Sequence, residues 1–544
     1  MEKYGLAIDV GTSGTRMHAV DLDSKKIIST AITMRHPVPG ANVMDHLTFC
    51  IEVDRGLAHR LLIDTSNRLM KLLDIDLKKV ERVAICGNPI QLSIYQDMEV
   101  RDLAFAMPNA LKSRGVELQK RDATVLNAAD IGLELSDNVE LYVPPAIRHE
   151  IGADALAMMY KTNLLDRKEN VLVTDYGTNA EMALKVGDEI YTGSAAAGPA
   201  IEGQSIKAGM LAAPGAISDV DAFMDWKCIV LDDAILAQEG DTVNPNTGTV
   251  VTESAMHGKA TGITGTGVIA AIAEGLSNGL IKMPHINTVD GRLHLQDGVI
   301  LTEHDIVEAS KTFGAMRAGH FTLLEHAGLK FEELDIMYMS GASGTYVDAH
   351  KAQRVGLLPP SCGQIFQYGN TSLALALDLV RDPGLLDNLQ SLANSIRANH
   401  VMFATDKVFE TVFIQELAYW TEGMPMEMYN MMLGLQDIQP LPEKIKDAQV
   451  TRTVLRDIPD LGYKGLRVLR DIGIFMEGSF EGCIGCSKCV DDCPENAITM
   501  TPMGDTYNMR IASDLCNGTA CLRCERVCPE KVFKVKELQK NILK

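Results

Sequence analysis

Eight of the twelve cysteines fall between positions 483 and 528, in two runs whose spacing suits the binding of iron. The first run reads CIGCSKCVDDCP and the second reads CNGTACLRCERVCP. The first has the C-x2-C-x2-C-x3-C-P pattern that holds [4Fe–4S] clusters, and the second has four residues where the first gap has two. The thiols are Cys483, Cys486, Cys489, Cys493, Cys516, Cys521, Cys524 and Cys528. Two clusters in series predict a relay for single electrons.

The order of the cysteines also predicts which of them share a cluster. Three thiolates around one turn hold three irons of a cubane, whereas the cysteine before the proline reaches the other cluster. One [4Fe–4S] site is therefore expected at Cys483, Cys486, Cys489 and Cys528, and the other at Cys493, Cys516, Cys521 and Cys524.

Zinc and disulfides are the alternatives for these thiols. Zinc ribbons usually separate their two C-x2-C pairs by a long loop, and disulfides do not suit a cytosolic compartment. The four scattered cysteines are expected to be small buried hydrophobes instead. They are Cys50, Cys86, Cys228 and Cys362.

Two other segments could bind phosphate, because each places glycine and hydroxyl groups between two strand-like runs. The apolar run Leu6–Val10 leads into DVGTSGT (9–15), and a second alternating run follows. The tip of such a hairpin offers backbone N–H groups and hydroxyls to a phosphate, and Asp9 could hold a metal-bound water. The D-x-G-T pattern recurs at Asp175, again between strand-like runs. Two copies predict duplicated domains that face one phosphate chain.

Two further glycine-rich stretches have different implications. YMSGASGT (338–345) follows an apolar run, and its glycines would let the backbone turn beneath a nucleobase and ribose. GITGTGVIAAIAEGL (262–276) mimics a dinucleotide-binding fingerprint, but the preceding residues make a poor strand, which that fingerprint requires. We expect a loop that opens a helix over 268–280 there, and a Rossmann site is the alternative.

The rest of the chain must supply the elements that position these groups. At 544 residues it is too long for one hydrophobic core, so two to four domains are expected. Helical spacing of apolar residues predicts helices within 384–435, and prolines among mixed charges predict a linker after them. We divide the chain into a first lobe (1–165), a second lobe (166–435), a linker (436–475) and a cluster domain (476–544).

Composition excludes several classes of protein. The net charge of −21 gives no basic footprint for nucleic acid. No run approaches the roughly 18 uninterrupted apolar residues of a membrane span. The opening MEKYGLAIDV enters a strand-like run without a signal region. We expect a soluble, cytoplasmic protein that binds neither nucleic acid nor membranes.

In their order along the chain, the three glycine motifs resemble the phosphate-1, phosphate-2 and adenosine motifs of the acetate/sugar kinase–Hsp70–actin superfamily. Longer stretches look like the reductive activators of corrinoid proteins, and this resemblance covers roughly 1–435. They include YVPPAIRHEIGADALA (142–157), SAAAGPAIEGQSIKAGMLAAPGAI (194–217) and AQRVGLLP (352–359). The resemblance implies an α/β fold of duplicated ribonuclease-H-like (actin/Hsp70-type) ATPase lobes, followed by an α+β domain like that of bacterial ferredoxins.

The resemblance further implies ATP-dependent reduction of Co(II) to Co(I) on a partner protein, by single-electron transfer through two [4Fe–4S] clusters. It points to the activators that serve methylamine methyltransferase corrinoid proteins in methanogenesis. The implied partners are these corrinoid proteins in the Co(II) form and a low-potential electron donor such as a ferredoxin. Because the chain lacks the D-x-H-x-x-G motif, the corrinoid is expected on the partner.

The resemblance also implies a set of ATP- and Mg2+-binding residues, in which Asp9 and Asp175 are the catalytic candidates. Glu202 is a further candidate to orient water or metal. The set is Asp9, Gly11, Thr12, Ser13, Gly14, Thr15, Asp175, Gly177, Thr178, Asn179, Gly341, Ala342 and Ser343.

Three other functions fit parts of the pattern. An activator of 2-hydroxyacyl-CoA dehydratases also couples ATP to one-electron transfer, but it uses one cluster bridging two subunits. A small-molecule kinase with structural clusters would need a carboxylate base and no electron donor. An Hsp70-like chaperone or redox sensor would need a substrate-binding β-domain after the ATPase, and we identify none in the sequence.

Overall fold

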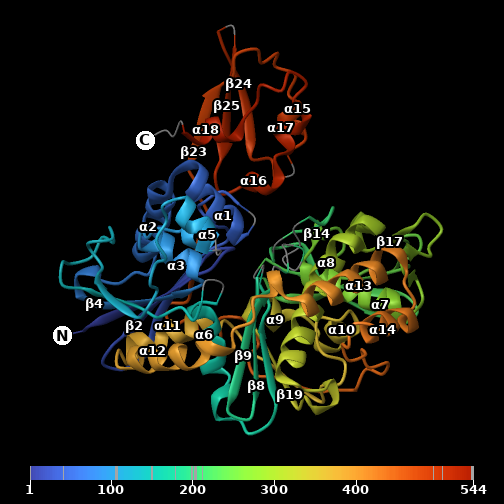
Figure 1. The fold of residues 1–544 in the computed structure, drawn as a ribbon. Helices are drawn as coiled ribbons and strands as arrows, with labels where there is room; N and C mark the ends of the chain where they lie inside the picture. Colours follow the sequence, from blue (N-terminus) through green and yellow to red (C-terminus); the bar gives the residue numbers. More distant parts are fainter. Residues whose placement is uncertain are drawn as a thin grey trace. The chain divides into compact units, whose positions relative to one another are not determined.

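The computed structural model describes residues 2–540 except 41, 105–107, 149–150, 178, 196, 198–199, 201–204, 211, 234, 494 and 505. The chain folds into two compact units, whose elements are labelled in Figure 1. Unit 1 comprises residues 1–157, 372–395 and 460–544, and unit 2 comprises residues 158–371 and 396–459.

Unit 1 is built on a seven-stranded sheet with the order β22-β3-β2-β1-β4-β6-β5. β1 is buried along almost its whole length, because helices α2, α11 and α12 contribute side chains to the same core. The strands β1, β2 and β3 form an antiparallel meander, and β4 runs parallel to β1. The strands are β1 (Tyr4–Val10), β2 (Thr15–Asp21), β3 (Ile27–Thr33), β4 (Val80–Gly87), β5 (Thr124–Asn127), β6 (Glu140–Val143) and β22 (Leu466–Leu469).

Short and long helices connect these strands. A π-helical turn over Cys50–Asp54 joins α1 to α2. The helices are α1 (Val43–Phe49), α2 (Arg55–Leu72), α3 (Pro89–Tyr95), α4 (Arg101–Ala104), α5 (Pro108–Ser113), α6 (Ala153–Lys161), α11 (Thr371–Arg381) and α12 (Leu385–Ile396).

The cysteine-rich end of the chain forms a small α+β domain with its own core, within unit 1. Its sheet has the order β23-β25-β24, and both outer strands run antiparallel to β25. The elements are β23 (Phe475–Ser479), α15 (Lys488–Asp491), β24 (Ile498–Met503), β25 (Thr506–Ala512), α16 (Gly518–Cys521), α17 (Arg523–Val527) and α18 (Val535–Lys540).

Unit 2 repeats the central topology of unit 1. Its six-stranded sheet has the order β21-β20-β19-β7-β8-β9, in which β7, β8 and β9 form a meander and β19 runs parallel to β7. The strands are β7 (Val171–Asp175), β8 (Ala180–Val186), β9 (Glu189–Ala195), β19 (Ile336–Ser340), β20 (Gln364–Gln367) and β21 (Gln449–Arg452). This repetition agrees with the predicted duplication.

A second sheet and several helices complete unit 2. The second sheet has the order β13-β12-β11-β10-β14, and two small hairpins pair β15 with β16 and β17 with β18. Its strands are β10 (Ala216–Ala222), β11 (Trp226–Leu231), β12 (Ala237–Val243), β13 (Val250–Thr252) and β14 (Gly262–Ile263). The hairpin strands are β15 (Ile281–Lys282), β16 (His285–Ile286), β17 (Arg292–His294) and β18 (Ile300–Thr302). The helices are α7 (Gly265–Ser277), α8 (Glu303–Ala327), α9 (Gly341–Tyr346), α10 (Ala349–Arg354), α13 (Lys407–Glu422) and α14 (Met426–Gly434).

Several local predictions are confirmed. Both Asp-x-Gly-Thr motifs lie between antiparallel strands, and α12, α13 and α14 occupy the predicted helical region. The segment 262–276 opens a helix, which begins at Gly265 with Thr264 as its N-cap. The four scattered cysteines are buried. No helix within the described ranges is both long and apolar enough to cross a bilayer.

The compact units do not follow the predicted boundaries. α11 and α12, placed by sequence in the second lobe, lie in unit 1 because their leucines enter its core. The predicted linker 436–475 instead contributes one strand to each large sheet, β21 in unit 2 and β22 in unit 1. Composition does not reveal this, since both strands have four residues and neither contains a buried one.

Candidate functional site

The turn between β1 and β2 carries the first Asp-x-Gly-Thr motif and is tight. Gly11 donates its N–H to the carbonyl oxygen of Gly14 across 3.1 Å, and a Cβ on Gly11 would lie 2.8 Å from that oxygen. This close approach requires glycine. Asp9, at 4% exposed, precedes the turn with its carboxylate 3.4 Å from Nη1 of Arg16. Ser13 lies in the same turn.

Neighbouring elements fix the two threonines of this turn. The N–H of Thr15 donates to Oγ1 of Thr33 across 2.8 Å. Asn88 donates from Nδ2 to Oγ1 of Thr12 across 3.2 Å. Its Oδ1 accepts the N–H of Gln91 at 2.9 Å and so caps helix α3. The predicted phosphate-1 residues therefore meet at the end of β1, held from the N-terminus of α3.

In unit 2 the fold brings the second Asp-x-Gly-Thr motif and the predicted adenosine motif together. Asp175 ends β7, and its Oδ2 accepts a hydrogen bond of 3.1 Å from Oγ of Ser340. The N–H of Tyr176 donates to the Ser340 carbonyl at 3.0 Å. Gly341 has φ +83°, and a Cβ there would lie 2.4 Å from Oδ1 of Asp175. Only glycine fits between this carboxylate and the backbone.

The remaining predicted residues of unit 2 are distributed as follows. Gly177 and Asn179 lie in the turn between β7 and β8, whereas Thr178 and Glu202 fall outside the described residues. Ala342 and Ser343 belong to the first turn of α9. The prediction of a glycine turn at 338–345 was therefore wrong, because the strand β19 passes directly into a short helix.

The eight clustered cysteines line two separate cavities in the C-terminal domain. Apolar side chains such as Phe480, Met509 and Phe533 share the first cavity with its thiols, and Ile498, Leu515 and Val535 share the second. The first cavity contains Cys483, Cys486, Cys489 and Cys528. The second contains Cys493, Cys516, Cys521 and Cys524. The fold therefore groups the thiols into the same two sets of four as the sequence reasoning did.

The chemistry of both cavities fits iron–sulfur clusters. Four thiols surround each cavity, and cysteine thiolates are the ligands of such clusters. Burial raises the pKa of Cys489 to about 11 and those of Cys516 and Cys524 to about 12. These thiols are neutral at pH 7 without a cation beside them, so bound iron is what would hold them as thiolates.

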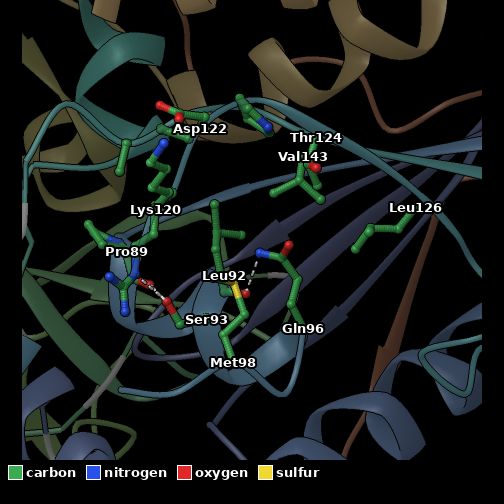
Figure 2. A pocket seen from close by; sticks show the side chains of 14 residues that line it. Pro89, Leu92, Ser93, Gln96, Met98, Lys120, Asp122, Thr124, Leu126 and Val143 are labelled. Carbon is green, nitrogen blue, oxygen red and sulfur yellow. Dashed lines mark hydrogen bonds between the residues drawn. The ribbon is translucent and has the colours of Figure 1, made fainter. Parts of the chain in front are cut away.

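One cavity was missed by the sequence reasoning. It has a volume of about 260 Å3 and lies beside α3 in unit 1, where Leu92, Ser93 and Gln96 line one side (Figure 2). Arg121 also lines it, and its side chain pairs with the buried Asp102 at 2.6 Å. No motif marks these residues, since they come from helix, loop and strand segments that only folding brings together.

Three matches to known families divide the chain. Residues 4–167 match the family described as "RACo middle region". Residues 169–430 match "C-terminal domain of RACo the ASKHA domain". Residues 482–532 match "4Fe-4S dicluster domain", which implies two [4Fe–4S] clusters.

Comparison with individual proteins also indicates similarity to corrinoid protein activators. The chain is 49% identical over 520 residues to the Co(II) methylated amine-specific corrinoid protein reductase of Methanosarcina barkeri, covering 95% of this chain and 96% of that protein. It is 23% identical over 455 residues to the corrinoid activation enzyme RamQ of Eubacterium limosum, covering 76% and 70%. A solved structure of a reductive activator for corrinoid, iron–sulfur protein has a TM-score of 0.62 at 22% identity, covering 76% of this chain and 66% of that one.

The solved structure supports the fold, and the relative in M. barkeri extends the likeness across both the ATPase-like units and the cysteine domain. The predicted fold class is confirmed. The chain belongs to the RACo family of corrinoid protein reductive activators, with an ASKHA fold followed by a 4Fe-4S dicluster domain.

Proposed function

We propose that this protein reduces Co(II) to Co(I) on the corrinoid proteins of methylamine methyltransferases, in an ATP-dependent reaction. The observation that carries the proposal is the 49% identity to the M. barkeri reductase over 95% of the chain, which includes the cysteine domain. The electron donor is a low-potential carrier such as a ferredoxin. The cobalt belongs to the partner protein and is the substrate.

ATP and Mg2+ bind at the two Asp-x-Gly-Thr turns and the Ser340–Ser343 segment. The tightness of these turns supports the assignment, because a Cβ on Gly11 or Gly341 would collide with the Gly14 carbonyl or the Asp175 carboxylate. Asp9 and Asp175 are the acidic groups suited to orient Mg2+ or its water. The proposed residues are Asp9, Gly11, Thr12, Ser13, Gly14, Thr15, Asp175, Gly177, Thr178, Asn179, Gly341, Ala342 and Ser343.

The two sets of four cysteines hold the two [4Fe–4S] clusters. When bound, these clusters supply single-electron transfer. The protein's own contribution is to surround the thiols with apolar side chains, such as Phe480 and Leu515, which limit the access of water. Cys486 is the exposed member of the first set.

ATP is required because the reduction is uphill from ordinary donors. A one-electron gap of about 300 mV corresponds to about 7 kcal/mol. Moving donor and acceptor closer together changes the rate and leaves this equilibrium unaltered. Nucleotide must therefore favour a state of the protein that binds the corrinoid partner with its cobalt easier to reduce.

An anaerobic absorption experiment tests the proposal. The holoprotein is mixed with a Co(II)-state corrinoid protein and a low-potential reductant, with and without ATP and Mg2+. The Co(I) band is expected only with ATP. Asp9→Asn should abolish its formation, whereas Asp23→Asn, an exposed matched control in the β2–β3 turn, should leave it unchanged.

Two results would overturn the proposal. ATP hydrolysis without any change at cobalt would contradict corrinoid reduction for that partner and favour an activator of the 2-hydroxyacyl-CoA dehydratase type. Transfer of the γ-phosphate to a small molecule would favour a kinase in which the clusters are structural.

A further inference from the structure

A chain of hydrogen-bonded polar groups runs through unit 1 from the phosphate-1 turn toward the second cysteine cavity, and it is buried beyond the half-buried Thr12. It begins at Thr12, whose Oγ1 accepts from Nδ2 of Asn88, and continues where Oδ1 of Asn88 accepts the N–H of Gln91. Gln91 is fully buried, so the amide of its side chain must find its partners inside the protein.

Two histidines satisfy that amide. Nε2 of His36 lies 3.1 Å from Oε1 of Gln91, and Nε2 of Gln91 lies 2.7 Å from Nδ1 of His46. The two imidazole rings stack with their centroids 3.9 Å apart. Because burial lowers the pKa of both histidines, they are neutral and each has one donor and one acceptor nitrogen.

The hydrogen bonds fix a single tautomer for each ring. His36 donates from Nε2 to Gln91, and its Nδ1 accepts the N–H of Val38 at 3.2 Å. His46 accepts at Nδ1 from Gln91, so its Nε2 carries the proton and lies against Gly40. The network therefore holds the segment 37–40 near both of its ends. Nε2 of His46 is buried without a hydrogen-bond partner among the described residues, so this ring holds Gly40 by packing contact and not by a hydrogen bond.

The other side of the same segment contacts the second cysteine run. The carbonyl of Pro37 accepts from Oγ of Ser513 at 2.9 Å, and the N–H of Gly40 donates to the carbonyl of Cys516 at 3.0 Å. Arg35, just before it, pairs at 3.3 Å with Glu495, which lines the second cavity. Helix α1, which carries His46, packs against α16 of the second run (Figure 1).

Gly40 shows how closely these parts fit. A Cβ at this position would lie 2.5 Å from Cβ of Asp45 and 2.9 Å from the ring of His46, and Gly40 has φ +145°. Gly518, at the start of α16, lies as close on the other side, because its own Cβ would come within 3.3 Å of Gly40. A shift of His46 would therefore move Gly40, and with it the backbone bonded to Cys516.

We infer that Gln91 is a positioning residue that couples the phosphate-1 turn to the second cysteine cavity, so that nucleotide at this turn alters the cluster held by Cys493, Cys516, Cys521 and Cys524. The inference rests on the proposed function, since it takes Thr12 to contact nucleotide. It makes the second cluster the one that ATP controls. Coupling of this kind needs a direct energetic test, because a contiguous path alone does not establish it.

Hydrogen exchange on the wild-type holoprotein gives the first test. The anaerobic protein is compared with and without Mg2+ and a non-hydrolysable ATP analogue. Protection is expected to change at residues 36–46 and 512–518, and to stay the same at residues 480–489 around the first cavity. A change confined to residues 9–15, or one that also includes 480–489, would overturn the inference.

The second test is a redox titration that is monitored by electron paramagnetic resonance. In the wild type, the nucleotide analogue should shift the reduction potential of one cluster, identified as the signal that Cys524→Ala removes. Gln91→Leu and Asn88→Ser should both lose this shift while keeping the wild-type iron content. Asn88→Ser cuts the chain at Thr12 yet retains a good N-cap for α3. Gln96→Leu, at the C-cap of the same helix, is the matched control and should keep the shift.

Persistence of the shift in Gln91→Leu and Asn88→Ser, or a shift of the other cluster, would overturn the inference. These measurements contain no corrinoid protein. A failure to form Co(I) would therefore contradict the proposed function alone, whereas a missing nucleotide effect on the clusters would contradict the coupling. If the proposed function and the coupling are both correct, Gln91→Leu should slow ATP-dependent Co(I) formation by about tenfold. This is within the usual range of coupling between sites.

Discussion

At the scale of single residues, glycine is required in the two proposed nucleotide motifs for different steric reasons. Gly11 is required by the closeness of its own turn, whereas Gly341 is required by the carboxylate of Asp175 and by a left-handed φ. Both motifs are visible in the sequence. The contact between Asp175 and Gly341 is not visible there. Asp175 ends β7 and Gly341 directly follows β19, and these two parallel neighbours are far apart in the chain.

Gly341→Ala tests this packing directly. A methyl group 2.4 Å from Oδ1 of Asp175 must displace the carboxylate, and an L-residue at φ +83° adds about 1–2 kcal/mol of backbone strain. We expect a lower unfolding midpoint and a loss of ATP affinity by calorimetry. Gly328→Ala is the matched control, since Gly328 has φ +63° and open space around its Cβ position. It should lose stability but bind ATP normally; equal ATP binding by both variants would contradict a role for Gly341 beside nucleotide.

The buried histidines predict a pH dependence of stability. Burial lowers the pKa of His18 and His36 to about 4 and that of His320 to about 3. The unfolded chain binds a proton on each below about pH 6.5, whereas the folded protein does not. Stability is therefore lost as the pH falls below 6.5, by about 1.4 kcal/mol per histidine at pH 5.5.

The variants His18→Asn and His304→Asn separate the contribution of the buried histidines from other effects of low pH on stability. His304 has an exposed side chain and serves as the control. Between pH 7.5 and 5.5, His18→Asn should lose less free energy of unfolding than the wild type by about 1.4 kcal/mol, and His304→Asn should match the wild type. An unchanged loss in His18→Asn would contradict the assignment.

At the scale of elements, the two cysteine runs exchange their fourth members. Cys493 belongs by sequence to the first run but lines the second cavity, and Cys528 does the reverse. Cys493→Ala should therefore perturb the same paramagnetic signal as Cys521→Ala. Cys528→Ala should perturb the same signal as Cys486→Ala. The opposite pairing would show that each run holds its own cluster.

Local signals in the sequence predicted the helices and strands around each site well. They predicted poorly which elements pack together over long distances in the chain. The apolar runs around Asp9 and Asp175 specify the paired strands, because alternation and glycine turns act over a few residues. By contrast, α9 was predicted to be a turn, and α11 and α12, which follow second-lobe residues in the sequence, pack into the core of unit 1. Their partners lie far away in the chain, so no local pattern reveals which core receives their leucines.

At the scale of the whole molecule, the cysteine domain is bonded directly to the rest of unit 1. It has a core of its own, yet hydrogen bonds at Pro37 and Gly40 and the ion pair of Arg35 with Glu495 join it to the segment 35–46. The sequence predicted a domain joined through a linker. That prediction missed the attachment because the residues that make it, among them Arg35, Pro37 and Gly40, match no motif. The attachment is the physical basis for ATP control of one cluster.

The central claim is that ATP changes the equilibrium of cobalt reduction rather than only its rate. The most direct measurement holds an anaerobic mixture of holoprotein and corrinoid protein at a fixed ambient potential above that of the Co(II)/Co(I) couple, and reads the Co(I) fraction by absorbance. With ATP and Mg2+, the steady Co(I) fraction should exceed the value that the potential alone allows, by tenfold for every 59 mV of coupling. If ATP only shortens the time needed to reach the same fraction, the protein is a catalyst of electron transfer without energetic coupling, and the central claim is wrong.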